Sequence, residues 1–168
     1  AAGLTGAIGA LPDDIRITAA ATDGFLFPNA VLDERNLNLR KGYPETYDVA
    51  AMQAALTGVK AGLRTALPRY SHVTYDVDHG NPLIVERPDV LILDGLHLAQ
   101  VEQPDRARLI DVLIYLDAPE GVLEGWFTAR LIPLMKEGRD DPSSFYYRFR
   151  TLDDAQCADF AKRVWEGI

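Results

Sequence analysis

The sequence of 168 residues contains a single cysteine, Cys157, and only three histidines. One cysteine excludes an internal disulfide and a multi-cysteine metal site. The histidines do not have the spacing of zinc ligands, so we expect no zinc site. No apolar stretch approaches the roughly 20 residues needed to cross a bilayer, and the chain does not start with a basic, apolar leader. These absences predict a cytoplasmic protein that makes no membrane contact.

Positive charge is also scarce, because 17 Lys and Arg face 25 Asp and Glu, giving a net charge of −8. This balance argues against a nucleic-acid-binding surface. The motif Gly-x-x-x-x-Gly-Lys-Ser/Thr, whose backbone N–H groups and lysine cradle phosphates, is absent. Residues 1–11 are typical of a helix without a capping residue, and the chain ends without a helix stop. We therefore expect both ends of the sequence to be cut from something longer, and any phosphate cradle of this motif to lie upstream of residue 1.

Apolar residues are instead plentiful, at 48%, and they gather in continuous runs. Three runs, at residues 15–21, 90–93 and 112–116, predict buried strands, because continuous Val, Ile and Leu suit a parallel sheet covered on both faces. Helical patterns lie between and after them, including one that Asp48 could cap and that runs to about Lys60. Strands that alternate with helices indicate an α/β fold.

An antiparallel hairpin is also expected between the first two runs. Residues 70–77 and 83–86 could pair across a turn at residues 78–81, which contain Asp, Gly and Asn.

Acidic residues follow two of the predicted strands. Asp23 comes directly after the run at 15–21, where open α/β sheets place ligands and catalytic groups. A hydroxyl positioned there could lose its proton to Asp23; the alternative is a plain Asp-Gly turn. Asp94 directly follows the run at 90–93. In nucleotide-binding sheets, an acid at the end of a strand often orients the hydration shell of the magnesium ion. The alternative for Asp94 is a strand-terminal turn.

Two further groups of side chains could hold a small polar substrate. Tyr70 and His72 lie two residues apart, so they would share one face of a strand. The alternative is an ordinary strand with one exposed face. Phe127 and Arg130 share one face of a helix, and the guanidinium could clamp a carboxylate or a phosphate. The alternative for Arg130 is a solvated surface position.

Several stretches together resemble the type I (bacterial) pantothenate kinase family, which belongs to the P-loop kinase class that includes uridine kinase and phosphoribulokinase. The resemblance covers essentially the whole chain in order. The stretches that carry it are 22–29 (TDGFLFPN), 40–48 (RKGYPETYD), 70–76 (YSHVTYD), 88–96 (PDVLILDGL), 115–120 (YLDAPE), 141–145 (DPSSF) and the helix with Trp165.

This resemblance implies a three-layer P-loop kinase fold with a mainly parallel sheet. It makes residues 1–168 a fragment of a single kinase-like domain, with the P-loop expected upstream and a C-terminal part expected downstream. It implies phosphorylation of the primary hydroxyl of pantothenate, the first step of coenzyme A biosynthesis, with ATP and Mg2+ as cofactors. It further implies a homodimer that coenzyme A could inhibit.

Residue by residue, the resemblance makes Asp23 the base that faces the acceptor hydroxyl, and Asp94 the counterpart of a glutamate in the magnesium shell. Tyr70, His72 and Arg130 match positions that hold pantothenate.

This sequence departs from the family at several positions. Phe127 replaces a tyrosine that contacts substrate, and His97 replaces an asparagine. Other departures stand where family members often have phenylalanine: Leu131, Leu134 and Arg139.

These departures leave two other interpretations open. The altered aromatic positions would suit a kinase of the same class that acts on another small alcohol, such as a nucleoside or a sugar acid. The missing P-loop would suit a non-catalytic, degenerate kinase module that binds coenzyme A or a partner.

Overall fold

A computed structural model describes residues 14–102 and 108–166, and the helix expected at 1–11 lies outside this range. The described chain forms two compact units. The first contains residues 14–71, 76–102 and 108–113, and the second contains residues 72–75 and 114–166. No helix in the described part of the chain has the length and apolar character of a membrane span.

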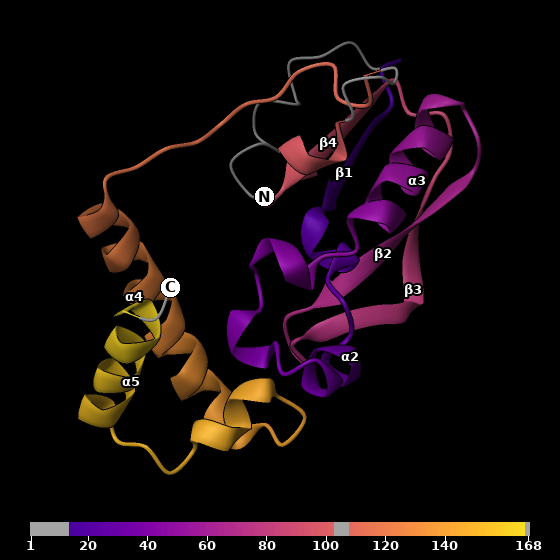
Figure 1. Ribbon diagram of the computed structural model, residues 1–168. Helices are drawn as coiled ribbons and strands as arrows, with labels where there is room; N and C mark the ends of the chain where they lie inside the picture. Colours follow the sequence, from indigo (N-terminus) through magenta and orange to yellow (C-terminus); the bar gives the residue numbers. More distant parts are fainter. Residues whose placement is uncertain (1–13, 103–107, 167–168) are drawn as a thin grey trace. The chain divides into compact units, whose positions relative to one another are not determined.

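A parallel pair of strands organises the first unit (Figure 1). In strands β1 (Ile17–Ala21) and β4 (Val90–Asp94), Ile17 lies opposite Val90 and Ala21 lies opposite Asp94. The two predicted strands are therefore confirmed, with their bounds shifted by one or two residues. Because the strands are parallel neighbours, their carboxyl ends lie at one edge of the sheet.

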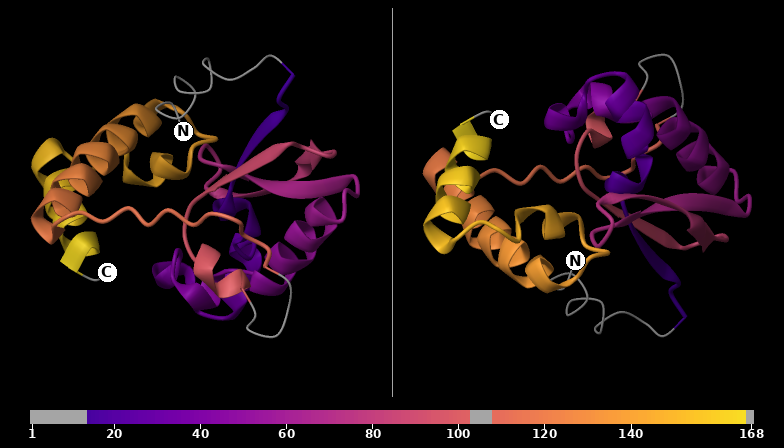
Figure 2. Two further views of the ribbon diagram at one scale, coloured as in Figure 1. Left: turned by 90° about the horizontal axis from the view of Figure 1, so that it is seen from above. Right: turned by 90° about the horizontal axis from the view of Figure 1, so that it is seen from below.

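An antiparallel hairpin of β2 (Thr65–Ser71) and β3 (Asp76–Val85) accompanies this pair (Figure 2). Its turn spans residues 72–75, so the turn predicted at 78–81 is wrong. The pairing passes from Leu67 opposite Leu83 to Arg69 opposite Asp78. Residues 79–82 of β3 thus lie opposite the single residue Pro68 of β2, so β3 has three extra residues there. They form a bulge, in which Gly and Pro are common because they suit interrupted pairing.

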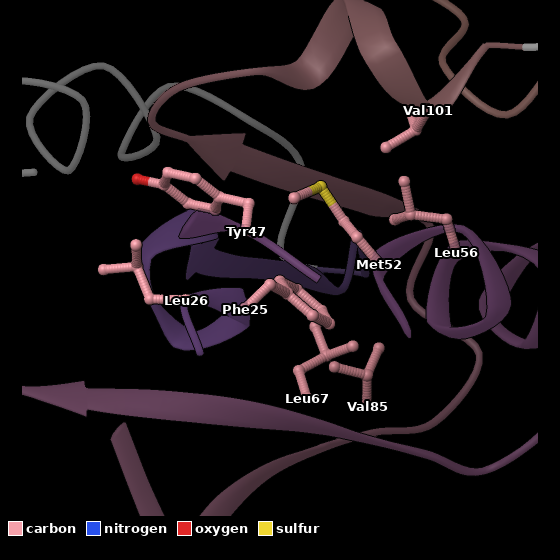
Figure 3. Close-up of a cluster of buried hydrophobic side chains, with 8 residues drawn as sticks. All are labelled: Phe25, Leu26, Tyr47, Met52, Leu56, Leu67, Val85 and Val101. Atoms are coloured by element: carbon pink, nitrogen blue, oxygen red, sulfur yellow. The ribbon is translucent and has the colours of Figure 1, made fainter. Parts of the chain in front are cut away.

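Helices and apolar side chains complete the first unit. Helix α2 (Asn29–Glu34) follows the first strand, and α3 (Val49–Lys60) is capped as predicted, since the Asp48 side chain accepts a hydrogen bond from the Ala51 N–H at 2.8 Å. Side chains from several of these elements converge in one buried cluster, which we call the first core (Figure 3). Its members are Phe25, Leu26, Tyr47, Met52, Leu56, Leu67, Val85 and Val101.

The second unit is built on α4 (Glu120–Glu137) and α5 (Asp154–Glu166), which pack against each other. Helix α4 continues through Pro133. Met135, Tyr146 and Cys157 form the buried centre of this unit.

Short 3-10 helices connect the longer elements of both units. They are η1 (Thr22–Phe25), η2 (Asn38–Arg40), η3 (Pro44–Thr46), η4 (Leu98–Val101), η5 (Gly138–Asp140) and η6 (Phe145–Phe149).

The third predicted strand, at residues 112–116, is wrong. These residues form no strand, and their side chains are exposed, from 50% for Leu113 to 87% for Leu116. An apolar run becomes a strand only when a neighbour accepts and donates its backbone hydrogen bonds. No segment of residues 14–102 and 108–166 pairs with it.

Candidate functional site

Two carboxylates lie at the carboxyl edge of the parallel pair. Asp94 ends β4 opposite Ala21, and Asp23 follows two residues after Ala21, in the turn η1. Asp23 is half-buried, whereas Asp94 is exposed. The register of the strands thus brings the two predicted site residues to the same edge, where α/β proteins bind their ligands.

A buried hydroxyl ties the two strand ends together. Thr22 is fully buried, and its Oγ1 accepts a hydrogen bond from the Leu96 N–H at 2.9 Å. Gly95 lies between Asp94 and Leu96 with a φ of +138°, and a Cβ there would stand 2.0 Å from Thr22 Oγ1. Only glycine fits both the backbone angle and the space. The positions of Asp23 and Asp94 are therefore coupled through Thr22.

The hairpin of β2 and β3 also packs closely against this edge of the sheet. A Cβ on Gly24 would stand 2.0 Å from the carbonyl oxygen of Pro68 in β2. The absence of a side chain at Gly24 lets β2 run directly beside the Asp23 turn. Tyr70, two residues after Pro68, belongs to the same strand.

Tyr47 contacts the Asp23 carboxylate directly. Its hydroxyl donates a hydrogen bond to Asp23 Oδ1 at 3.0 Å, while Tyr47 as a whole residue is only 4% exposed in the first core. A phenol is a good donor to a carboxylate, and the bond orients the carboxylate.

Lys41 brings a positive charge to the same unit. Its Nζ donates to Asn29 Oδ1 at 2.6 Å and lies 4.9 Å from the centroid of the Tyr70 ring. Burial lowers the pKa of the Lys41 ammonium from 10.5 to about 8, against the attraction of Asp76 and Asp23. At pH 7 the group is therefore mostly charged, so it can attract an anionic group.

The carboxylate of Asp76 supports this arrangement from the start of β3. Its Oδ1 accepts hydrogen bonds from the Asn29 N–H at 2.9 Å and from its neighbour Val77 at 2.8 Å. It thereby fixes the start of α2, which carries the amide that holds Lys41.

Tyr70 and His72 do not share a strand face, contrary to the sequence expectation. Tyr70 is half-buried in β2, but β2 ends at Ser71 and His72 is exposed in the following turn. Tyr70 belongs to the first compact unit and His72 to the second. The alternation argument fails because the hairpin turns earlier than the sequence indicates.

Phe127 and Arg130 lie one turn apart on α4 in the second unit. The Phe127 ring packs against Trp165 of α5, with 5.6 Å between the ring centroids. Arg130 is exposed. Burial and the neighbouring Tyr75 raise the pKa of Tyr146, and the charge of Arg130 acts in the opposite direction. The guanidinium of Arg130 thus lies near an aromatic cluster and stays accessible to a ligand.

Sequence reasoning did not single out Lys41 and Tyr47. Both belong to the stretch 40–48, which counted only as part of a resemblance. No local sequence pattern predicts that they lie near Asp23. Tyr47 is brought there by a bridge to Leu26, and Lys41 by its hydrogen bond to Asn29. The sequence signal that could have indicated them is the group of ionisable side chains in residues 40–48.

The carboxylates suit a magnesium ion that is shared with phosphates. Across residues 14–102 and 108–166, no group of three or more His, Cys, Asp or Glu side chains could hold a metal ion. Mg2+ usually binds one or two carboxylates together with water and substrate phosphates. Asp94, exposed at the edge beside Asp23, fits such a site.

The sequence is similar to those of known proteins. The chain is 39% identical over 166 residues to a pantothenate kinase of Chelativorans sp. (strain BNC1), and 37% identical to those of Brucella ovis and Brucella canis. Each match covers 94% of this chain and 52% of the relative. The chain therefore spans about half the length of the curated relatives it matches.

The fold has a solved counterpart in a protein of Silicibacter sp. TM1040, assigned as a kinase of a fructose transport system. The two share a TM-score of 0.63 and 24% sequence identity, over 99% of this chain and 76% of that one. This likeness confirms the predicted α/β P-loop kinase fold. Residues 29–130 match the model of the phosphoribulokinase and uridine kinase family, which is well over half of the chain, so the chain belongs to the phosphoribulokinase/uridine kinase family.

Proposed function

We propose that the protein containing this chain is a kinase that uses ATP to phosphorylate the primary hydroxyl of pantothenate. The main support is the similarity to pantothenate kinases along nearly the whole chain. The observation that carries the chemistry is Asp23, which lies at the carboxyl edge of the parallel strands and whose carboxylate is held by Tyr47.

In the proposed reaction, Asp23 accepts the proton of the acceptor hydroxyl. The hydroxyl oxygen then forms a bond to the γ-phosphorus of ATP as the bond to the leaving ADP oxygen breaks. Mg2+, when bound, neutralises charge on the transferring phosphoryl group. Asp94 would hold its hydration shell, directly or through water. Most catalysis of this kind comes from positioning and electrostatics, which suits the coupling of Asp23 and Asp94 through Thr22.

We propose that Tyr70, His72 and Arg130 hold the acceptor and that Phe127 gives an apolar wall. Pantothenate carries a carboxylate, and arginine offers paired donors suited to it. The phosphate cradle would come from a P-loop outside these 168 residues, since the sequence contains no such motif. By the same resemblance, the protein would be a cytoplasmic homodimer that coenzyme A inhibits.

Steady-state kinetics of Asp23→Asn in the full-length enzyme test the reaction. The amide keeps the shape of the carboxylate but cannot take the proton, so turnover should fall by roughly 10²–10⁴-fold while the KM for the acceptor changes little. Asp140→Asn, at an exposed position in the second unit, is the matched control and should keep normal turnover. Near-normal turnover of Asp23→Asn would remove Asp23 from the base role.

Binding titrations test the acceptor. They should compare pantothenate, its carboxamide analogue, a nucleoside and glycerate, in the wild type and in Arg130→Ala. We expect pantothenate to bind best, and the variant to lose affinity for pantothenate but not for the carboxamide. If pantothenate does not bind and Arg130→Ala leaves the affinity of the preferred ligand unchanged, the acceptor is another small alcohol.

A further inference from the structure

Tyr47 belongs to the first core, yet its polar end reaches the site. The ring packs among Phe25, Met52 and other apolar side chains, and its oxygen lies at the edge of the cluster (Figure 3). That hydroxyl donates to Asp23 Oδ1 at 3.0 Å. Burial of the ring removes most of its freedom to move, so the donor is held in place before any substrate arrives.

Backbone pairing sets the distance between these two residues. Leu26 and Tyr47 form an antiparallel bridge. The Phe27 N–H donates to the Thr46 carbonyl at 2.9 Å, and the Asp48 N–H donates to the Phe25 carbonyl at 2.8 Å. The segment that carries Tyr47 is therefore joined to the segment that follows Asp23.

His97 supports the Tyr47 ring from the segment after β4. The two rings meet edge to face, with 4.8 Å between centroids and 66° between planes. His97 Nε2 lies 2.8 Å from the Gly42 carbonyl oxygen, which can only accept, so Nε2 is the donor. Nδ1 then accepts from Gln100 Nε2 at 3.1 Å. Since both ring nitrogens are engaged, the imidazole is fixed in orientation.

We propose that Tyr47 is a positioning residue for Asp23 and that His97 holds Tyr47 in place. The Tyr47 hydroxyl engages Oδ1, and Oδ2 has no hydrogen bond within residues 14–102 and 108–166. The carboxylate is thus turned so that Oδ2 receives the acceptor proton. The inference rests on the proposed function, in which Asp23 is the base.

A double-mutant cycle on the full-length enzyme tests this inference, using Tyr47→Phe, Asp23→Asn and the double variant. Tyr47→Phe keeps the buried ring and removes only the hydroxyl. We expect kcat to fall roughly 10-fold, the loss of one hydrogen bond to a charged group, with the KM for the acceptor unchanged. In the Asp23→Asn background the same substitution should have almost no further effect, because Tyr47 acts through Asp23.

Two further variants complete the design. Tyr147→Phe removes the hydroxyl of a half-buried tyrosine in the second unit and should leave kcat unchanged. His97→Leu removes both ring nitrogens and should lower kcat in the wild type but not in Tyr47→Phe.

The outcomes separate this inference from the proposed function. If Asp23→Asn is nearly as active as the wild type, the proposed base is wrong. If Asp23→Asn loses activity but Tyr47→Phe does not, Tyr47 does not position Asp23. The same conclusion holds if the fold-losses of kcat in the two single variants multiply in the double variant. If the His97→Leu and Tyr47→Phe losses multiply, His97 does not act through Tyr47.

Discussion

The Lys41 ammonium is the basis of a prediction about stability and pH. Its pKa in the folded protein is about 8, because burial of the charge outweighs the attraction of Asp76 and Asp23. In the unfolded chain the value returns to 10.5. Between pH 8 and 10.5 the unfolded chain therefore binds a proton that the folded protein has lost. Stability rises with pH wherever the unfolded state binds more protons, so this group should add stability across that window.

The size of the effect follows from the two pKa values. A difference of about 2.5 between them corresponds to at most about 3.4 kcal/mol. Lys41 is only about half-buried, and solvent screening lowers the expected effect to about 1–2 kcal/mol. Below pH 8 both states hold the proton, and the folded protein carries the full cost of the buried charge.

Lys41→Met removes the charge and keeps most of the aliphatic chain. Urea unfolding followed by circular dichroism, at pH 7, 8, 9 and 10, gives the free energy of unfolding of wild type and variant. Relative to the variant, the free energy of unfolding of the wild type should rise by about 1–2 kcal/mol between pH 7 and 10. Other titrating groups are common to both proteins and cancel in the difference.

Lys162→Met is the matched control, because Lys162 is exposed on α5 and lies 3.9 Å from Glu166. The difference in the free energy of unfolding between Lys162→Met and the wild type should not vary between pH 7 and 9. A wild-type advantage over Lys41→Met that stays constant, or that shrinks as the pH rises, would refute the argument that burial dominates at Lys41.

The parallel strands and α3 could be predicted because their signals are local. A continuous apolar run predicts β1 and β4, and Asp48 caps α3 through its own neighbour Ala51. The hairpin turn could not be located in this way. The Asp, Gly and Asn at 78–81 are typical of a turn, but Asp78 pairs with Arg69 and the Gly and Asn that follow it lie in a bulge. Pairing between distant residues prevails over local turn propensity here.

The run at 112–116 shows a different limit. Its composition is that of a buried strand, but a strand is stabilised by a partner, and the described residues contain none for it. Composition reports what a segment could bury, whereas the fold decides whether a neighbour is there.

Some residues of the candidate site could likewise be predicted from local sequence patterns, and others could not. Asp23 and Asp94 could be predicted from their positions after two apolar runs, since parallel strands end at one edge. Tyr47 and Lys41 come near Asp23 through the bridge at Leu26 and the amide of Asn29. These contacts link residues far apart in the sequence, so no spacing rule finds them.

Three further predictions concern the phosphate site and the packing around the sheet edge. The 168-residue polypeptide alone should transfer no phosphate from ATP to pantothenate, because its sequence has no P-loop motif; an enzyme-like rate in a coupled ADP assay would contradict this. Thr22→Val should lower the free energy of unfolding in urea by about 1–3 kcal/mol, because the Leu96 N–H loses its acceptor, whereas Thr22→Ser should cost much less. Gly24→Ala should destabilise the protein by about 1–3 kcal/mol, since its Cβ would stand 2.0 Å from the Pro68 carbonyl oxygen and backbone would have to move. Gly121→Ala is the matched control, because a Cβ there meets nothing within 4 Å and a helical alanine replaces a glycine, which favours the fold. Thermal unfolding of the two alanine variants should therefore shift in opposite directions, and equal melting temperatures would show that β2 does not pack against the Asp23 turn as closely as the structure describes.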